Sequence, residues 1–335
     1  MKIVVRVPNW IGDVVFALPA LRSLGAHYAG ADIRLAGPPW AADLLSGTEF
    51  ARKTIGLDPA GASPRTRETV AALKAGAFDT GILLTNSFSS ALLFRLARIR
   101  NRWGYRTDGR GLLLTRSVRR KKGLPPLHMV RTYLGLLEGL GIPTLPPSID
   151  LSVSDEARAK VTRLLAEFGI EPSRPLVLLA PGAAHGPAKR WPAARFGETG
   201  SLLQARFGAT VAVVGTAADA PLAAEAAAAM ATPPADLTGR TSLAELLGLF
   251  ERAAVLVTND SGPLHMANAL RTPVVAIFGP TDPRATGPFH EPARVLRCED
   301  IACWPCDDRD CPTDHPCMTC IMADDAARAA GEILR

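Results

Sequence analysis

The sequence has no apolar run long enough to cross a membrane. A transmembrane helix needs about 18 or more consecutive apolar residues, and none occurs among the 335 residues. The N-terminus, Met1–Val7, is typical of a β-strand and lacks the longer apolar stretch and the small-residue cleavage site of a signal peptide. We therefore expect a cytoplasmic protein.

The signature motifs of several enzyme classes are also missing. No GxGxxG motif follows an apolar run, which leaves a dinucleotide-binding site without support. Neither an HExxH zinc motif nor a GxSxG nucleophile elbow occurs, and the GxxxxGK[ST] spacing of a P-loop is absent. The chemistry must therefore come from other patterns.

Short apolar runs rich in β-branched residues alternate with helical stretches, which is typical of parallel sheets covered by helices on both faces. The predicted strands are Ile3–Val7, Asp32–Leu35, Gly81–Thr85, Leu176–Ala180, Thr210–Val214, Val255–Thr258 and Pro273–Phe278. The predicted helices include Val14–His27, Ala193–Phe207, Ala217–Ala231, Leu243–Arg252 and Gly262–Leu270.

The length favours two domains, and with 47% hydrophobic residues each domain can bury a core. The proline-rich segment Ile142–Asp150 cannot continue a helix, and a second α/β series begins at Leu176. We predict one domain over residues 1–155 and another over 156–335, both doubly wound. Ligands are then expected in the cleft between them, at the carboxyl ends of the strands.

Positive charge is concentrated in one segment. Between Arg95 and Lys122 there are eleven Lys or Arg and one acid, Asp108, a local net charge of +10, whereas the whole chain carries +6. Such a run favours an anionic partner, which can be phosphate groups, a phospholipid surface or nucleic acid; a solvated Arg-rich surface is the alternative. Because the run has only Trp103 and Tyr105 as aromatics and no RNA-binding motif, we expect no nucleic acid.

The first candidate motif, Pro8-Asn9-Trp10-Ile11-Gly12-Asp13, follows the first predicted strand. Gly12 allows a tight turn, and Asp13 falls where the first helix begins. Asp13 can either cap the helix or act as a general base toward an attacking hydroxyl. The spacing alone leaves both roles open.

The second motif, Ala180–Pro192, combines small residues with Lys189-Arg190 before a helix opened by Trp191-Pro192. Small residues let backbone N–H groups approach an anion, and Lys189 and Arg190 add positive charge. This pattern predicts a phosphate site, with an ordinary surface loop as the alternative.

The third motif is Thr258-Asn259-Asp260-Ser261-Gly262-Pro263-Leu264-His265. A helix is expected to begin near Ser261, and its N–H groups favour a diphosphate. Asp260 or Ser261 can cap this helix, and His265 can bind a phosphate or serve as a structural histidine. The next strand ends at the same edge in Phe278-Gly279-Pro280-Thr281-Asp282.

All six cysteines lie between Cys298 and Cys320. The two CxxC pairs, Cys303/Cys306 and Cys317/Cys320, have the spacing of a tetrahedral zinc site. An iron–sulfur cluster, or thiols or disulfides without metal, are the alternatives, and we favour the cysteines without metal. Because the segment lies beyond the catalytic motifs, we assign it a structural role.

Together these motifs resemble glycosyltransferase family 9, the ADP-heptose:lipopolysaccharide heptosyltransferases. The resemblance rests on Lys189–Pro192 with Arg195-Phe196, on Asn259–His265 and on Phe278–Asp282, and it extends over nearly the whole chain. The opening Pro8–Asp13 and the Cys-rich segment are most similar to the heptosyltransferase II subgroup.

The resemblance implies a GT-B fold, in which two Rossmann-like doubly wound domains face each other across a cleft, with the acceptor bound by the first and the donor by the second. It implies inverting transfer of L-glycero-D-manno-heptose from ADP-heptose to the heptosyl-Kdo inner core of lipopolysaccharide, with no cofactor required for catalysis. A GT-B transferase or epimerase that uses another nucleotide sugar, such as a UDP-sugar, is the alternative.

Carried over by position, the resemblance makes Asp13 the general base and Lys189 the group that neutralises the donor diphosphate. One departure is the stretch Gly215–Asp219, where only Asp219 is available to bind the donor ribose. The donor-binding residues would be Lys189, Arg190, Thr258, Asp260, Ser261, Gly262 and His265, and the acceptor-binding residues Asn9, Trp10, Gly12, Arg98 and Arg120.

The implied acceptor is a lipid A that bears Kdo and heptose and lies in an anionic membrane. We therefore expect the basic run to dock the acceptor or the bilayer, which places the protein peripherally at the inner face of the inner membrane.

Overall fold

The computed structural model describes residues 1–57, 67–120 and 127–335, which form two compact units. The N-terminal unit is Met1–Ile149 and the C-terminal unit is Asp150–Arg335. The boundary lies in the proline-rich segment Ile142–Asp150, and the domain boundary expected at residue 155 falls at the first residue of α6 (Asp155–Glu167). Across the described ranges, no helix is both long and apolar enough to cross a bilayer.

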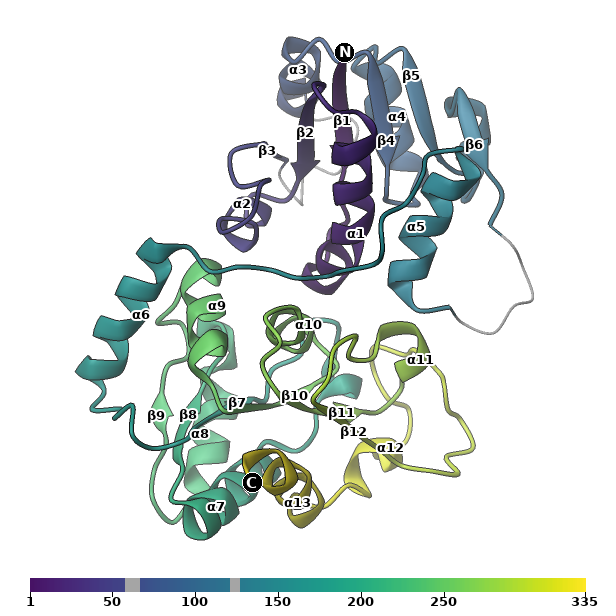
Figure 1. Ribbon diagram of the computed structural model, residues 1–335. Coiled ribbons are helices and arrows are strands. Elements are labelled where there is room, and N and C mark those ends of the chain that lie inside the picture. Colours follow the sequence, from purple (N-terminus) through teal and green to yellow (C-terminus); the bar gives the residue numbers. More distant parts are fainter. Residues whose placement is uncertain (58–66, 121–126) are drawn as a thin grey trace. The chain divides into compact units, whose positions relative to one another are not determined.

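The N-terminal unit is built around a six-stranded parallel sheet with the order β3-β2-β1-β4-β5-β6 (Figure 1). Its central strand is fully buried at Ile3, Val4 and Val5, because helices cover both faces of a parallel sheet. Val5 pairs with Leu35 on one side and Ile82 on the other. The strands are β1 (Lys2–Arg6), β2 (Asp32–Gly37), β3 (Thr54–Gly56), β4 (Thr80–Leu83), β5 (Asn101–Tyr105) and β6 (Arg116–Val118).

Helices form the outer layers of this unit. α1 packs along α5 (Figure 1). α4 packs against α3 and the short 3-10 helix η2. One apolar cluster joins Phe94 of α4 and Leu73 of α3 to Val4 and Leu83 of the sheet. The helices are α1 (Ile11–His27), α2 (Ala41–Leu44), α3 (Arg67–Ala75), α4 (Phe88–Leu96), η2 (Arg110–Leu113) and α5 (Met129–Gly139).

The C-terminal unit repeats this plan with a parallel sheet of order β12-β11-β10-β7-β8-β9. Alternate residues of neighbouring strands, such as Val177, Val211 and Val257, join one core cluster, as the twofold side-chain period of a strand requires. The strands are β7 (Leu176–Ala180), β8 (Thr210–Val213), β9 (Ala235–Asp236), β10 (Val255–Asn259), β11 (Val274–Phe278) and β12 (Ala293–Arg297).

Two groups of helices accompany this second sheet. α7, α8 and α13 pack together over the core cluster, whereas α9 packs between α6 and α10. The prediction of two doubly wound α/β domains is confirmed. The remaining helices are η3 (Pro187–Lys189), α7 (Ala193–Phe207), η4 (Ala217–Asp219), α8 (Ala220–Ala228), α9 (Leu243–Arg252), α10 (Gly262–Ala269), α11 (Pro283–Thr286), α12 (Pro316–Thr319) and α13 (Ala323–Leu334).

The strand order determines where ligands can bind. In each sheet the order reverses between the first and fourth strands in sequence, that is, between β1 and β4 and between β7 and β10. At such a point the loops leave toward opposite faces of the sheet and open a crevice beyond the carboxyl ends of the strands. Functional residues are therefore expected in the loops that follow these four strands.

The close approach of α7 to α8 generates a stability prediction. A Cβ atom at Gly197 would collide with the carbonyl of Ala226, whereas one at Gly25, near the end of α1, would meet nothing within 4 Å. We expect Gly197→Ala to lower the free energy of unfolding by about 1–3 kcal/mol through overpacking. Gly25→Ala should raise it by about 0.5–1 kcal/mol, because alanine loses less backbone entropy in a helix. Urea unfolding of both variants tests this, and equal effects would contradict the packing argument.

Candidate functional site

The loops after β7 and β10 are joined by one buried amide. Asn259, the last residue of β10, is fully buried, and its Nδ2 donates to the carbonyl of Pro181 at 2.8 Å. Its Oδ1 accepts the N–H of Trp191 at 3.0 Å. Asn259 thus fixes both ends of the loop that contains Lys189. The sequence showed Asn259 within a motif but gave it no role.

The side chains of Lys189 and Asp260 form an ion pair at this point. Lys189 Nζ lies 2.7 Å from Asp260 Oδ2, and the two side chains are only 13% and 2% exposed. Thr281 donates its hydroxyl to the same oxygen at 2.6 Å, and His265 Nε2 lies 3.6 Å from Oδ1. A buried pair is stable only when further hydrogen bonds satisfy its charges, and here the loop after β11 supplies one. The structure therefore brings Lys189, Asp260 and His265, from two of the motifs, into contact.

The N-terminus of α10 borders this ion pair. Ser261 occupies the N-cap position but makes no side-chain capping bond, and its hydroxyl donates to the carbonyl of Asn259 at 3.3 Å. Asp260 directs its carboxylate to Lys189 and Thr281. Neither Asp260 nor Ser261, the two expected caps, therefore accepts hydrogen bonds from the N–H groups of the first turn. Gly262 has no side chain to cover the backbone there. A helix start of this kind attracts anions.

The other predicted donor residues lie in different surroundings. Thr258 is fully buried in β10, and its hydroxyl donates a hydrogen bond to the carbonyl of Asn259. Arg190 is exposed beside Lys189. The carboxylate of Asp219 accepts the N–H and the hydroxyl of Thr216 at 2.9 and 2.7 Å, which caps η4. The acid considered for the donor ribose thus has a local structural role.

In the N-terminal unit, Asp13 lies in the first turn of α1 and Trp10 occupies the N-cap position. The hydroxyl of Tyr133 donates to Asp13 Oδ1 at 3.1 Å. Burial, followed by the charge of Asp13 and the hydrogen bond to it, raises the pKa of Tyr133 well above its ordinary value, so the phenol stays protonated and remains a donor. A carboxylate oriented in this way at the end of β1 can accept a proton from a substrate hydroxyl. The sequence gave no indication of Tyr133, which is 120 residues away.

Two buried guanidinium groups organise the same edge of the sheet. Arg6 donates to the carbonyls of Val7 and Ala36 and, at 2.6 Å, to Asn9 Oδ1. Arg110 donates to the carbonyl of Tyr105 at 2.8 Å. Burial lowers the pKa of each arginine to about 10, which leaves both charged at neutral pH. Arg6 therefore places a positive charge beside Asn9, and Arg110 places another beside the end of β5.

The structure divides the basic run between two edges of the sheet. Arg98 precedes β5 and so lies at the amino ends of the strands, away from Asp13. Arg106 follows β5 and Arg120 follows β6, at the carboxyl ends. The charge of Arg120 partly opposes the rise in the pKa of Tyr133, the partner of Asp13. The structure thus associates Arg120, but not Arg98, with Asp13; Lys121 and Lys122 lie outside the described residues.

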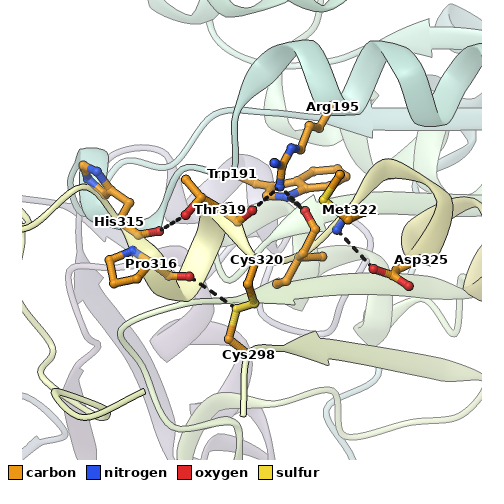
Figure 2. Close-up of a disulfide and its surroundings, with 10 residues drawn as sticks. Trp191, Arg195, Cys298, His315, Pro316, Thr319, Cys320, Met322 and Asp325 are labelled. Carbon is orange, nitrogen blue, oxygen red and sulfur yellow. Dashed lines mark hydrogen bonds between the residues drawn. A yellow bond between two sulfur atoms is a disulfide. The ribbon is translucent and has the colours of Figure 1, made fainter. Parts of the chain in front are cut away.

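The zinc site considered at Cys303, Cys306, Cys317 and Cys320 is not supported. Cys320 forms a disulfide with Cys298, which removes one of the four expected ligands (Figure 2). The ends of β12 and α12 bring the two Cα atoms to 6.2 Å, a separation that suits a disulfide. In the parts of the chain that the structure describes, no three His, Cys, Asp or Glu side chains form a group that could hold a metal ion. The four other cysteines are thiols.

Comparison with known proteins gives one consistent result. Residues 66–316 match the family described as glycosyltransferase family 9 (heptosyltransferase). The chain is 33% identical over 315 residues to the lipopolysaccharide heptosyltransferase 2 of Salmonella typhimurium, covering 89% of this chain and 88% of that protein. It is 31% identical over 316 residues to the lipooligosaccharide heptosyltransferase 2 of Haemophilus influenzae, with 89% and 88% covered. The structure of the Escherichia coli ADP-heptose heptosyltransferase II is similar with a TM-score of 0.82 and 30% identity, covering 100% of this chain and 98% of that one.

The ion pair of Lys189 and Asp260 generates a second prediction. We expect Lys189→Met to lower the free energy of unfolding by about 3 kcal/mol or more, because it leaves a buried carboxylate without its cation. In the double variant with Asp260→Asn neither charge is present. The loss should therefore be smaller than the sum of the single losses, with a coupling energy of about 0.5–3 kcal/mol.

Urea unfolding of the four proteins measures this coupling. Arg190→Met is the matched control, since this neighbouring side chain is exposed and should change stability by no more than about 0.5 kcal/mol. Strictly additive losses would show that Lys189 and Asp260 do not act as a pair.

Proposed function

The chain belongs to glycosyltransferase family 9, the heptosyltransferases, and on that premise we propose that it transfers L-glycero-D-manno-heptose from ADP-heptose to the heptosyl-Kdo inner core of lipopolysaccharide. The observation that carries this proposal is the similarity along nearly the full length to proteins named lipopolysaccharide heptosyltransferase 2. The site residues lie in the loops where a doubly wound sheet binds ligands, which supports it further.

In this proposal the C-terminal unit binds the donor diphosphate. Lys189 supplies a cation held by the buried carboxylate of Asp260, and the first turn of α10 presents N–H groups at Ser261 and Gly262. When the bond between the anomeric carbon and the phosphate oxygen breaks, negative charge grows on the departing ADP. Preorganised positive groups stabilise that charge more in the transition state than in the ground state. His265 and Arg190 are proposed to bind the same donor diphosphate.

Asp13 is the proposed general base. The acceptor hydroxyl attacks the anomeric carbon from the face opposite to ADP, so the configuration inverts in a single displacement. Its proton passes to the carboxylate of Asp13. Tyr133 holds this carboxylate in place. Asn9 and Trp10 precede α1, and Gly12 lies with Asp13 in its first turn.

The carboxyl edge of the N-terminal sheet is the proposed acceptor and membrane surface. Arg106, Arg119 and Arg120 are exposed there, directly after β5 and β6. Trp10 and Phe88, which follow β1 and β4, are 54% and 46% exposed, an unusual position for large apolar side chains. Arginine next to exposed apolar groups matches the headgroup region of an anionic bilayer. We therefore place the protein at the cytoplasmic face of the inner membrane.

A transfer assay tests the reaction. ADP-heptose is offered with acceptors that carry Kdo alone or heptosyl-Kdo, and the products are read by mass spectrometry. We expect one heptose to be added to heptosyl-Kdo, and Asp13→Asn to lower kcat by about 10²–10⁴-fold because the proton acceptor is lost. Tyr133→Phe keeps the base and should cost only about tenfold. Transfer from a UDP-sugar instead, or full activity in Asp13→Asn, would overturn the proposal.

Vesicle binding tests the membrane surface. Reversing three charges with Arg106→Glu, Arg119→Glu and Arg120→Glu should weaken binding to phosphatidylglycerol vesicles on the order of a hundredfold, since each basic residue near such a surface contributes about 1 kcal/mol. The matched control reverses Arg95, Arg98 and Arg100 near the amino edge. Equal effects of the two triple variants, measured by co-sedimentation, would mean that overall charge rather than this edge determines binding.

A further inference from the structure

The segment Cys298–Cys320 lies against the loop that carries Lys189. The N–H of Ala188 donates to the carbonyl of Arg309 at 3.1 Å, and Arg309 Nε donates to the carbonyl of His185 at 2.7 Å. At Gly186 a Cβ atom would collide with the backbone of Arg309. The contact is therefore close, and it involves the residues immediately before Lys189.

The same segment also lies against the loop after β11. The carbonyl of Pro280 accepts the N–H groups of Cys306 and Asp307 at 3.1 and 3.2 Å. Trp304 Nε1 donates to the carbonyl of Thr281 at 3.2 Å, and the hydroxyl of Thr281 donates to Asp260 at 2.6 Å. A chain of two hydrogen bonds thus leads from the indole of Trp304 to the carboxylate that holds Lys189.

Both ends of the segment are held by contacts within the C-terminal unit. The Cys298–Cys320 disulfide joins the end of β12 to the end of α12 (Figure 2). Directly beyond it, the carbonyl of Ile321 accepts the indole N–H of Trp191 at 3.0 Å, and Arg195 donates to the carbonyl of Thr319 at 2.7 Å. The disulfide therefore closes a loop whose middle part contacts two segments: the one before Lys189 and the one that contains Thr281, a partner of Asp260.

We propose that segment 298–320 is a positioning element of the donor site, in which Trp304 and Thr281 orient Asp260 and the Cys298–Cys320 bond holds the segment in place. This inference rests on the proposed function of Lys189 and Asp260 in binding the donor diphosphate. Thr281 and Trp304 are positioning residues, because they act through the carboxylate of Asp260. Opening the disulfide removes the covalent link between the two ends of the segment and weakens donor binding.

The disulfide is accessible to a reductant. A cavity of about 480 Å³ opens beside it, lined by Cys320, Arg297 and Arg328 among others. A thiolate of a dithiol attacks the sulfur of Cys320, the S–S bond breaks, and Cys298 leaves as a thiolate that takes up a proton. The second thiol of the reductant then displaces Cys320 from the mixed disulfide, so the protein gains two thiols and the reductant leaves as its own disulfide.

Steady-state kinetics with ADP-heptose tests the positioning role. Thr281→Val removes the hydrogen bond to Asp260 and should raise the donor KM about tenfold, with less than about a twofold change in the acceptor KM. Thr281→Ser retains the hydroxyl and should stay within about twofold of wild type. Trp304→Phe keeps an aromatic ring but loses the indole N–H and should raise the donor KM about threefold. Equal changes in donor and acceptor KM, or no change in Thr281→Val, would overturn the proposal.

Reduction tests the role of the disulfide. Dithiothreitol, with thiol titration to verify opening, should raise the donor KM of wild type several-fold and leave that of the Cys298→Ser/Cys320→Ser double variant unchanged. The Cys303→Ser/Cys306→Ser/Cys311→Ser variant is the matched control and should respond like wild type. An unchanged donor KM in verified reduced wild type contradicts the inference. ADP binding by calorimetry separates the two proposals, because a wild type that binds no ADP would refute the proposed function itself.

Discussion

The carboxylate of Asp260 is the group on which the candidate donor site depends. It lies at the end of β10 with 2% of its side chain exposed, and it contacts groups from three further places: Lys189 after β7, Thr281 after β11 and His265 within α10. A buried charge cannot remain unpaired without a large cost in free energy. These segments must therefore come together for the carboxylate to be tolerated, and the geometry of a cationic site at the strand ends follows from that requirement.

The fold was largely predictable because parallel strands between helices leave a strong pattern in the sequence. The buried strands β7 and β10 appear as β-branched runs, and the polar residues after them had to lie at one edge of the sheet. In contrast, β5 and β6 were missed, because Arg102 and Arg116 give these peripheral strands the charge pattern of a solvated surface. The guanidinium of Arg116 lies over the ring of Trp103, 5.6 Å from its centroid. Local composition does not reveal this cross-strand contact.

The site was predictable only as far as its residues belong to motifs. Asp13, Lys189 and Asp260 each follow a predicted strand, but the partners that orient them come from distant parts of the chain. Tyr133 reaches Asp13 across 120 residues, and no local spacing encodes such a contact. The two CxxC pairs show the limit of spacing, since it left a metal site and metal-free thiols or disulfides both open, and the chain path pairs Cys320 with Cys298. Spacing restricts which groups can meet, and the path of the backbone decides which do.

The division of the chain into two compact units has an evolutionary consequence. Asp13 and the arginines of the carboxyl edge belong to Met1–Ile149, whereas Lys189, Asp260 and the Cys298–Cys320 segment belong to Asp150–Arg335. The hydrogen bonds described above for each set lie within its own unit. Under the proposed assignment, a change of acceptor calls for substitutions in the first unit, while the nucleotide-sugar site of the second can keep its sequence.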